Sequence, residues 1–244
     1  MVAPTLMAAY VLVSVLNVIA VATGNDNGEA LTKPLLMPLL LAWVLTMAFT
    51  SAGRRLLVPL RWLAVGIVAA WAGDLLLMGD SDLSFALGLG AFLLMQACYL
   101  VAFLTVPGPG LVRAWKIAIV PYALAWLVLV ALVWNGAGGM RIPVLIYGAA
   151  LMTMALGALD LVLRLPQRLA WRVAIGAGLF VISDSLIALT AFGPLTESVR
   201  TGAAIMATYT AAQGLIASGF THGLLQKTYP DTAPERRDVR RVGR

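Results

Sequence analysis

Apolar residues along the chain fall into eight long runs, each close to the length of a helix that crosses a membrane. A spanning helix needs about 20 mostly apolar residues. The runs cover residues 3–22, 33–50, 56–78, 83–106, 115–134, 142–163, 171–192 and 201–225. Clusters of glycine, proline, asparagine and charged residues separate them, as is typical of turns. The pattern predicts an all-α fold, a polytopic membrane helix bundle with eight transmembrane helices and short loops.

Composition excludes a soluble domain. The 244 residues are 61% hydrophobic and only 11% charged, whereas soluble proteins carry about 25% charged residues. We therefore expect residues 1–226 to form a single transmembrane helical domain. Residues 227–244 are basic and have too little apolar surface to fold, so we expect a disordered cytoplasmic tail.

The distribution of basic residues predicts the orientation. If eight helices alternate in direction, 14 of the 17 Lys and Arg residues fall on the side that holds both termini. Positive charge favours the cytoplasmic side, so we expect both termini in the cytoplasm of a bacterium, with the helices in its plasma membrane. The net charge of +6 is explained in this way, and no nucleic-acid partner is expected. Ala20, Val21 and Ala22 resemble a signal-peptidase site, but no basic residue precedes them, so we expect no cleavage.

Two aspartates stand out because they lie inside predicted helices. Asp74 lies about 6 Å, and Asp184 about 12 Å, from the outer end of its helix at 1.5 Å per residue. An aspartate that faces lipid costs about 2.5–3.5 kcal/mol even on the lenient insertion scale. Both side chains should therefore face the interior of the bundle, in the same half of the bilayer. They mark a functional site or, alternatively, form structural hydrogen bonds.

Other polar side chains share helix faces. Gln96 and Tyr99 are three residues apart, and Tyr209 and Gln213 are four apart, so each pair lies on one face. Taken alone, such pairs more often join helices than take part in catalysis.

Three further features lie near helix ends. Lys33 opens its predicted helix on the outer side. One alternative is that its side chain extends to the lipid headgroups. The other is that it holds a phosphate or pairs with Asp74. Tyr147 is an interfacial aromatic residue unless the bundle turns it inward. Asp160 and Arg164 have the spacing of an ion pair within one helix. One cysteine and one histidine are too few for an ordinary zinc site, so no metal is expected.

Two buried carboxyl groups fit several chemistries. Burial disfavours the charged form of a carboxyl group and a neighbouring carboxylate disfavours it further, so one of the two can keep its proton while the other is charged. This arrangement suits hydrolysis through an oxocarbenium-like state, aspartic proteolysis and proton-coupled transport. Composition does not choose among them.

Six stretches of the chain resemble the YhhN-type lysoplasmalogenases, a family of multi-helix membrane enzymes. They are TKPLLMPLL, AGDLLLM, FALGLGAFLLMQACYL, IPVLIYGAALMTMALGAL, GLFVISDSLIAL and YTAAQGLIASG. The two aspartates on which the family is thought to depend match Asp74 and Asp184. Members usually carry histidine where this chain has Gln96.

The resemblance implies hydrolysis of the vinyl ether bond of lysoplasmalogen to a fatty aldehyde and a glycerophospho-headgroup, without a metal or an organic cofactor. The expected partners are a lysophospholipid or ether-lipid substrate and membrane lipids. Vinyl ether hydrolysis begins by protonation of carbon, which needs an acid and a nearby negative charge. We expect Asp184, the deeper group, to be the acid and Asp74 to stabilise the cation and direct water, although the roles could be exchanged. The expected substrate contacts are Lys33 for the phosphate, Gln96, Tyr99, Tyr209 and Gln213 for the glycerol and water, and Tyr147.

The main alternative is a proton-coupled membrane transporter of a small or lipid-like substrate, in which the two aspartates take up and release protons. The sequence has no pair of broken mid-membrane helices, which such carriers often use. An intramembrane aspartyl protease fits less well, because its second motif resembles Gly-x-Gly-Asp whereas this chain has Gly73-Asp74 and Ser183-Asp184. A purely structural role would leave activity unchanged when the aspartates are replaced.

Overall fold

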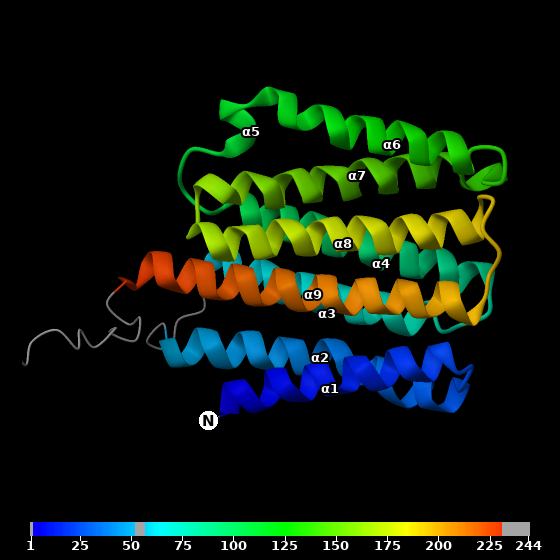
Figure 1. The fold of residues 1–244 in the computed structure, drawn as a ribbon, viewed down its shortest axis with the longest axis horizontal. Helices are drawn as coiled ribbons and strands as arrows, with labels where there is room; N and C mark the ends of the chain where they lie inside the picture. Colours follow the sequence, from blue (N-terminus) through cyan, green and yellow to red (C-terminus); the bar gives the residue numbers. More distant parts are fainter. Residues whose placement is uncertain (1, 52–56, 231–244) are drawn as a thin grey trace, which may run out of the picture.

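Long helices lie side by side and alternate in direction along the chain (Figure 1). The computed structural model describes residues 2–51 and 57–230, and within these ranges it contains no strand. The α-helices are α1 (Val2–Ala22), α2 (Asp26–Ser51), α3 (Val58–Leu76), α4 (Asp82–Leu104), α5 (Leu111–Ala114), α6 (Ile119–Val133), α7 (Arg141–Asp160), α8 (Gln167–Ala191) and α9 (Val199–Thr228). Short 3-10 helices η1 (Lys116–Ala118), η2 (Gly138–Met140) and η3 (Leu161–Leu163) lie between them. The predicted all-α fold is confirmed.

The two ends of the bundle are distinct. The start of α1 and the end of α9 lie at the same end (Figure 1). We call the opposite end, where α1 turns into α2, α3 into α4 and α8 into α9, the far end. At the far end Ser81 and Ser84 begin α4, and Ser198 and Thr201 begin α9, each pair as a capping box that satisfies free backbone N–H groups.

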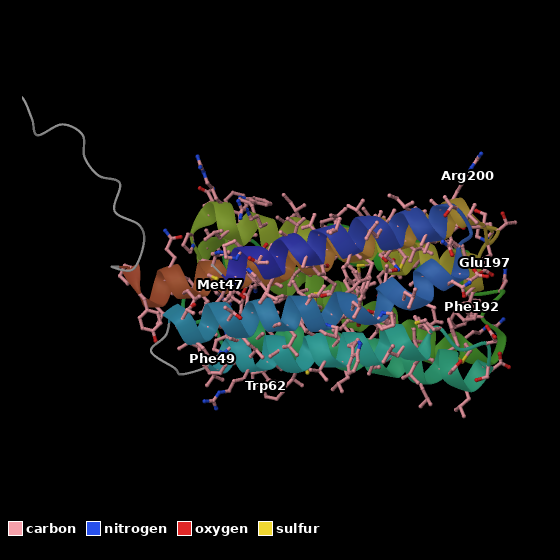
Figure 2. All side chains as sticks on the ribbon, turned by 90° about the horizontal axis from the view of Figure 1, so that it is seen from below. Met47, Phe49, Trp62, Phe192, Glu197 and Arg200 are labelled. Atoms are coloured by element: carbon pink, nitrogen blue, oxygen red, sulfur yellow. The ribbon has the colours of Figure 1, made fainter. Side chains whose placement is uncertain are left out.

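Within residues 2–51 and 57–230, seven helical segments are long and apolar enough to cross a membrane. They are α1, α2, α3, α4, α6 with η1, α7 with η2 and η3, and α8. Large apolar side chains such as Leu12, Leu94 and Val128 are exposed on the outside of the bundle. Glu197 and Arg200 lie instead at the far end, near Phe192 (Figure 2). The chain is thus a membrane protein by the length and composition of its helices.

The eighth predicted span, 201–225, forms α9 but is not among these seven. α9 packs on α1, α2 and α8, and its buried residues include Tyr209, Thr210, Gln213 and Thr221. A helix enclosed by others can carry polar side chains that would be costly in lipid. The low hydropathy of α9 follows from its position inside the bundle.

α2 begins earlier than the apolar pattern predicts, at Asp26 rather than Lys33. The side chain of Asn25 accepts a hydrogen bond from the backbone N–H of Gly28 at 3.0 Å, which caps the first turn. Pro38 has no N–H to bind the carbonyl of Pro34. The indole Nε1 of Trp71 in α3 donates to that carbonyl instead, at 2.9 Å. A hydrogen bond between two helices thereby replaces the one that the proline removes.

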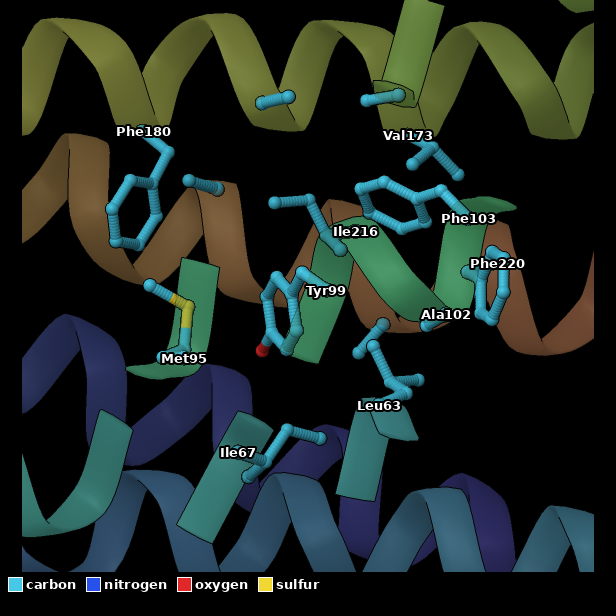
Figure 3. Close-up of a cluster of buried hydrophobic side chains, with 14 of the residues drawn as sticks. Leu63, Ile67, Met95, Tyr99, Ala102, Phe103, Val173, Phe180, Ile216 and Phe220 are labelled. Atoms are coloured by element: carbon cyan, nitrogen blue, oxygen red, sulfur yellow. The ribbon is translucent and has the colours of Figure 1, made fainter. Parts of the chain in front are cut away.

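The apolar core lies where α3, α4, α8 and α9 meet, as Figure 3 shows. Tyr99 and Phe103 of α4 lie among side chains of the other three helices, including Leu63, Phe180 and Phe220 (Figure 3). These five side chains are fully buried. The core thus holds in place the helices that carry the polar residues described below.

One glycine lets α8 and α9 approach closely. A Cβ atom on Gly176 would lie 2.9 Å from the carbonyl oxygen of Ala212 in α9, whereas a Cβ on Gly178 would meet nothing within 4 Å. We expect Gly176→Ala to lower the free energy of unfolding by about 1–3 kcal/mol, as overpacking does. Gly178→Ala is the matched control and should be neutral or stabilising, since alanine is the better helix former. Unfolding of both variants in detergent checks this, and equal stability would contradict the close approach.

Candidate functional site

Asp184 forms one polar cluster with residues of two other helices. Its Oδ2 accepts a hydrogen bond from the hydroxyl of Tyr147 in α7 at 2.5 Å and a longer one from Nε2 of Gln96 in α4 at 3.4 Å. Asp184 is 7% exposed and Gln96 is 1% exposed. The amide oxygen of Gln96, Oε1, is buried without a hydrogen-bond partner among the described residues. Tyr147 therefore points into the bundle rather than to the membrane interface.

Asp74 forms a second cluster with α9. Its Oδ2 accepts a hydrogen bond from the hydroxyl of Tyr209 at 2.8 Å, and both residues are buried. The two aspartates come from α3 and α8. Both face the interior of the bundle, as expected for carboxyl groups that avoid lipid.

Phe92 of α4 packs beside the Asp74 cluster. Its ring centroid lies 5.9 Å from that of Tyr209 and 6.5 Å from that of Phe180. A Cβ on Gly73 would lie 2.8 Å from the Phe92 ring. The glycine before Asp74 therefore makes room for an aromatic ring, which keeps the surroundings of both carboxyl groups apolar.

A further buried hydrogen bond joins α4 to α9, about one turn along α4 from Gln96. The hydroxyl of Tyr99 donates to Oε1 of Gln213 in α9 at 2.6 Å, and both side chains are fully buried. Shared helix faces were predicted for Gln96 with Tyr99 and for Tyr209 with Gln213. In the structure each of these residues binds a partner on another helix, so the face of α4 meets both α8 and α9.

One cavity borders the Asp184 cluster, and a larger cavity lies next to it. The smaller, which we call the slot, has a volume of about 40 Å³ and is lined by Asp184, Tyr147 and apolar residues of α4, α6, α7 and α8. The larger, which we call the vestibule, has a volume of about 640 Å³. Its lining includes Lys33 and the acidic residues Asp26, Glu29 and Glu197. Leu77, Phe85 and Ile187 line both cavities, so an apolar pocket and a polar one are neighbours. Asp184 lines the apolar one.

Lys33 occupies a different position from the predicted one. It lies two turns inside α2, and its Nζ forms an ion pair with Oε1 of Glu29 at 2.9 Å. The expected alternative of an ion pair with Asp74 is therefore wrong. Glutamate four residues before lysine favours such a pair within a helix. Lys33 lines the vestibule with its partner.

Asp74 lines neither the slot nor the vestibule. Of the two aspartates, only Asp184 borders one of these cavities. The expected ion pair of Asp160 and Arg164 is confirmed. It lies at the end of the bundle opposite the site, where Oδ1 of Asp160 also accepts from the backbone N–H of Val112 at 2.7 Å.

A polar stripe on α1 was missed in the sequence. Tyr10, Ser14 and Asn17 are all buried. The hydroxyl of Tyr10 donates to the carbonyl of Thr210 at 2.7 Å, and Nδ2 of Asn17 donates to the hydroxyl of Thr32 at 2.9 Å. The spacing of four and then three residues places them on one helix face, and that spacing was the signal available. These residues attach α1 to α9 and α2, beside the site.

The arrangement can perform acid chemistry on a molecule that is partly polar and partly apolar. The carboxyl group of Asp184, with its hydroxyl donor Tyr147, lines an apolar cavity that shares three lining residues with a polar one. Asp74 supplies a second buried carboxyl group from α3. Residues 2–51 and 57–230 contain no group of three or more His, Cys, Asp or Glu side chains that could hold a metal ion.

Known proteins resemble this chain over most of its length. The YhhN family matches residues 28–220. A protein of Mycobacterium bovis named lysoplasmalogenase is 32% identical over 219 residues, which cover 85% of this chain and 76% of that protein. A protein of the same name from Mycobacterium tuberculosis matches with the same identity and coverage. No solved structure matches the chain. With most of its length matched in this way, the chain belongs to the YhhN family.

Proposed function

We propose that this protein is a membrane-embedded hydrolase that cleaves the vinyl ether bond of lysoplasmalogen to a fatty aldehyde and a glycerophospho-headgroup. The names of its mycobacterial relatives support this assignment. The observation that carries it is that Asp184 lines the apolar slot, which shares Leu77, Phe85 and Ile187 with the polar vestibule. In lysoplasmalogen the vinyl ether lies between the headgroup and the hydrocarbon chain, so a lipid bound across the two cavities brings that bond to Asp184.

The proposed arrangement in the membrane has eight spans, with α9 as the eighth, and both termini in the cytoplasm of a bacterium. The 30 residues of α9 extend about 45 Å at 1.5 Å per residue, which exceeds the hydrocarbon thickness of about 30 Å. Four of the described basic residues lie just before or within the first turns of helices at the end that holds the termini: Arg61, Arg164, Arg168 and Arg172. Positive charge favours the cytoplasmic side of a membrane. The site then lies in the outer leaflet.

In the proposed first step, Asp184 transfers its proton to the carbon of the vinyl group that lies farther from the ether oxygen. The other vinyl carbon becomes an oxocarbenium ion. Both hydrogen bonds to Asp184 among the described residues end on Oδ2, so Oδ1 is the oxygen available to carry the proton. The hydroxyl of Tyr147 stabilises the carboxylate that remains, because hydrogen bonds to charged groups are the stronger ones.

In the second step water adds to the oxocarbenium carbon, and its proton returns to the Asp184 carboxylate. The resulting hemiacetal breaks its bond to the glycerol oxygen and gives the aldehyde and a free hydroxyl group. The negative charge of Asp74 stabilises the cation, because a fixed charge in an apolar surrounding acts strongly on a developing one. The unpartnered Oε1 of Gln96 is the acceptor proposed to hold the water.

The vestibule is the proposed site of the headgroup, with Lys33 as its phosphate contact. Its volume of about 640 Å³ lies in the range of about 300–1,000 Å³ that is usual for ligand sites. Tyr99, Tyr209 and Gln213 are proposed to orient the site. Tyr99 donates to Gln213, and Tyr209 donates to Asp74.

The proposal is tested with three lipids that share one headgroup: lysoplasmalogen, its saturated ether analogue and an ester lysophospholipid. Purified protein in detergent is incubated with each, and the released aldehyde is measured. Only the vinyl ether can be protonated to an oxocarbenium ion, so only lysoplasmalogen should give aldehyde. Failure to release aldehyde from lysoplasmalogen would overturn the proposed function.

Tyr147→Phe removes only the hydroxyl that binds Asp184. We expect kcat to fall about 10- to 100-fold, because a hydrogen bond to a charged group contributes about 1.5–3 kcal/mol. Tyr10→Phe is the matched control: it also deletes a buried hydroxyl with a hydrogen bond, of 2.7 Å, but to a backbone carbonyl. Aldehyde release by both variants is compared with wild type, and an equal effect of the two substitutions would exclude a specific role for Tyr147.

A further inference from the structure

The slot beside Asp184 is too small for the chain of a lipid. Its volume is about 40 Å³, whereas one enclosed water already needs about 10–15 Å³ and sites for drug-sized ligands usually measure about 300–1,000 Å³. The slot therefore has room for only the first few carbon atoms of a long hydrocarbon chain. The rest of the chain must lie elsewhere.

Among the helices that line the slot, α6 is the one held least firmly by the rest of the bundle. Leu129 of α6 lines the slot, yet Val133 is the only buried residue of that helix. α6 packs mainly on α7 and less on α8, at the edge of the bundle (Figure 1). Its outward side chains, among them Leu124 and Val128, are more than half exposed. In a membrane this helix has lipid on its outer side.

The attachments of α6 lie at its two ends. At the far end, Nε of Arg141 donates to the carbonyl of Trp134 at 2.9 Å. Beyond the opposite end, α5 is held by the hydrogen bond from the backbone of Val112 to Asp160. The middle of α6 is joined to α7 by the side-chain hydrogen bond from Nε1 of Trp126 to the carbonyl of Leu145, which is long at 3.3 Å.

We propose that the slot binds the first carbon atoms of a single unbranched hydrocarbon chain, and that the rest of the chain passes α6 sideways into the bilayer. α6 moves outward to admit the chain and to release the aldehyde by the same path. This inference rests on the proposed function for the identity of the lipid. It predicts that the protein accepts chains of many lengths, because the slot contacts only their beginning.

The test is a reversible lock on α6. In a Cys98→Ala background, Trp126→Cys and Leu145→Cys place thiols where α6 and α7 already touch. A short bifunctional thiol reagent joins them, and reduction releases them. Two vinyl ethers with the same headgroup are compared, one with a long chain and one with a propenyl group that fits the slot. Each single-cysteine variant, treated with the same reagent, controls for modification alone.

We expect the locked protein to hydrolyse the long-chain lipid about tenfold more slowly or worse, as when a lid is held closed, and to recover on reduction. The short substrate should keep its rate in both states. Undiminished turnover of the long-chain lipid in the locked protein would overturn the lateral path. Loss of both activities would also count against it, because a short chain needs no movement of α6.

A second measurement needs no hydrolysis and separates this inference from the proposed function. Spin labels replace the exposed residues Leu124 of α6 and Ile182 of α8, and the saturated ether lysolipid is added. The distance between the labels should lengthen, while a control pair at Ile182 and Leu94 of α4 should not change. An unchanged α6 distance would overturn the lateral path even in a protein that releases aldehyde. A lengthened distance in a protein that releases none would overturn only the proposed function.

Discussion

Asp184→Asn should reduce aldehyde release from lysoplasmalogen by about 10²–10⁴-fold, the usual contribution of a general acid. Asparagine has nearly the same shape and can still accept the hydrogen bond from Tyr147, but it has no proton to give at that position. The slot should remain formed, so KM should change little. The measurement is steady-state aldehyde release with the purified variant, beside its unfolding temperature in the same detergent.

Asp80→Asn serves as the control for this experiment. Asp80 is an exposed carboxylate in the turn between α3 and α4, so its loss should alter neither rate nor stability. If Asp184→Asn is folded and hydrolyses lysoplasmalogen at the wild-type rate, the proton comes from another group and the proposed first step is wrong.

Asp74→Asn should lower kcat by about 10²–10³-fold, as the loss of one preorganised electrostatic contact at a developing charge does. The substitution keeps an acceptor for the hydroxyl of Tyr209 and removes the negative charge. Since Asp74 lines neither the slot nor the vestibule, substrate affinity should be nearly unchanged. The readout is kcat and KM with lysoplasmalogen.

Tyr209→Phe separates the charge of Asp74 from its hydrogen bond. It deletes the 2.8 Å contact and leaves the carboxylate in place, so its effect on kcat should be clearly smaller than that of Asp74→Asn. The reverse order would mean that Asp74 acts by holding Tyr209 in α9 and not through its charge.

Most of the helical architecture could be predicted from hydrophobic patterning alone. The described part of each of the eight predicted segments forms a helix, because runs of apolar residues in lipid satisfy their backbone only as helices. Helix starts outside the apolar runs were harder to predict. The first two turns of α2 are polar, and the cap from Asn25 and the ion pair of Glu29 with Lys33 extend the helix beyond the apolar segment.

The partners of the polar residues could not be predicted in the same way. Helix periodicity shows which side chains share a face, but not which face of another helix they meet. Gln96 and Tyr99 share a face of α4, yet Gln96 binds Asp184 in α8 and Tyr99 binds Gln213 in α9. The vestibule was missed for a similar reason, since Glu29 and Glu197 come from separate ends of the chain and meet only in the folded bundle.

Hydrolysis in heavy water tests the chemistry most directly. Lysoplasmalogen is converted by the wild-type protein in deuterium oxide, the aldehyde is trapped at once, and its mass spectrum is recorded. Protonation by Asp184 predicts one deuterium on the carbon next to the aldehyde carbon and a slower rate than in ordinary water, with little aldehyde formed by Asp184→Asn in the same time. Enzymatically released aldehyde without that deuterium would contradict proton transfer to the vinyl carbon, and with it the proposed role of the two aspartates.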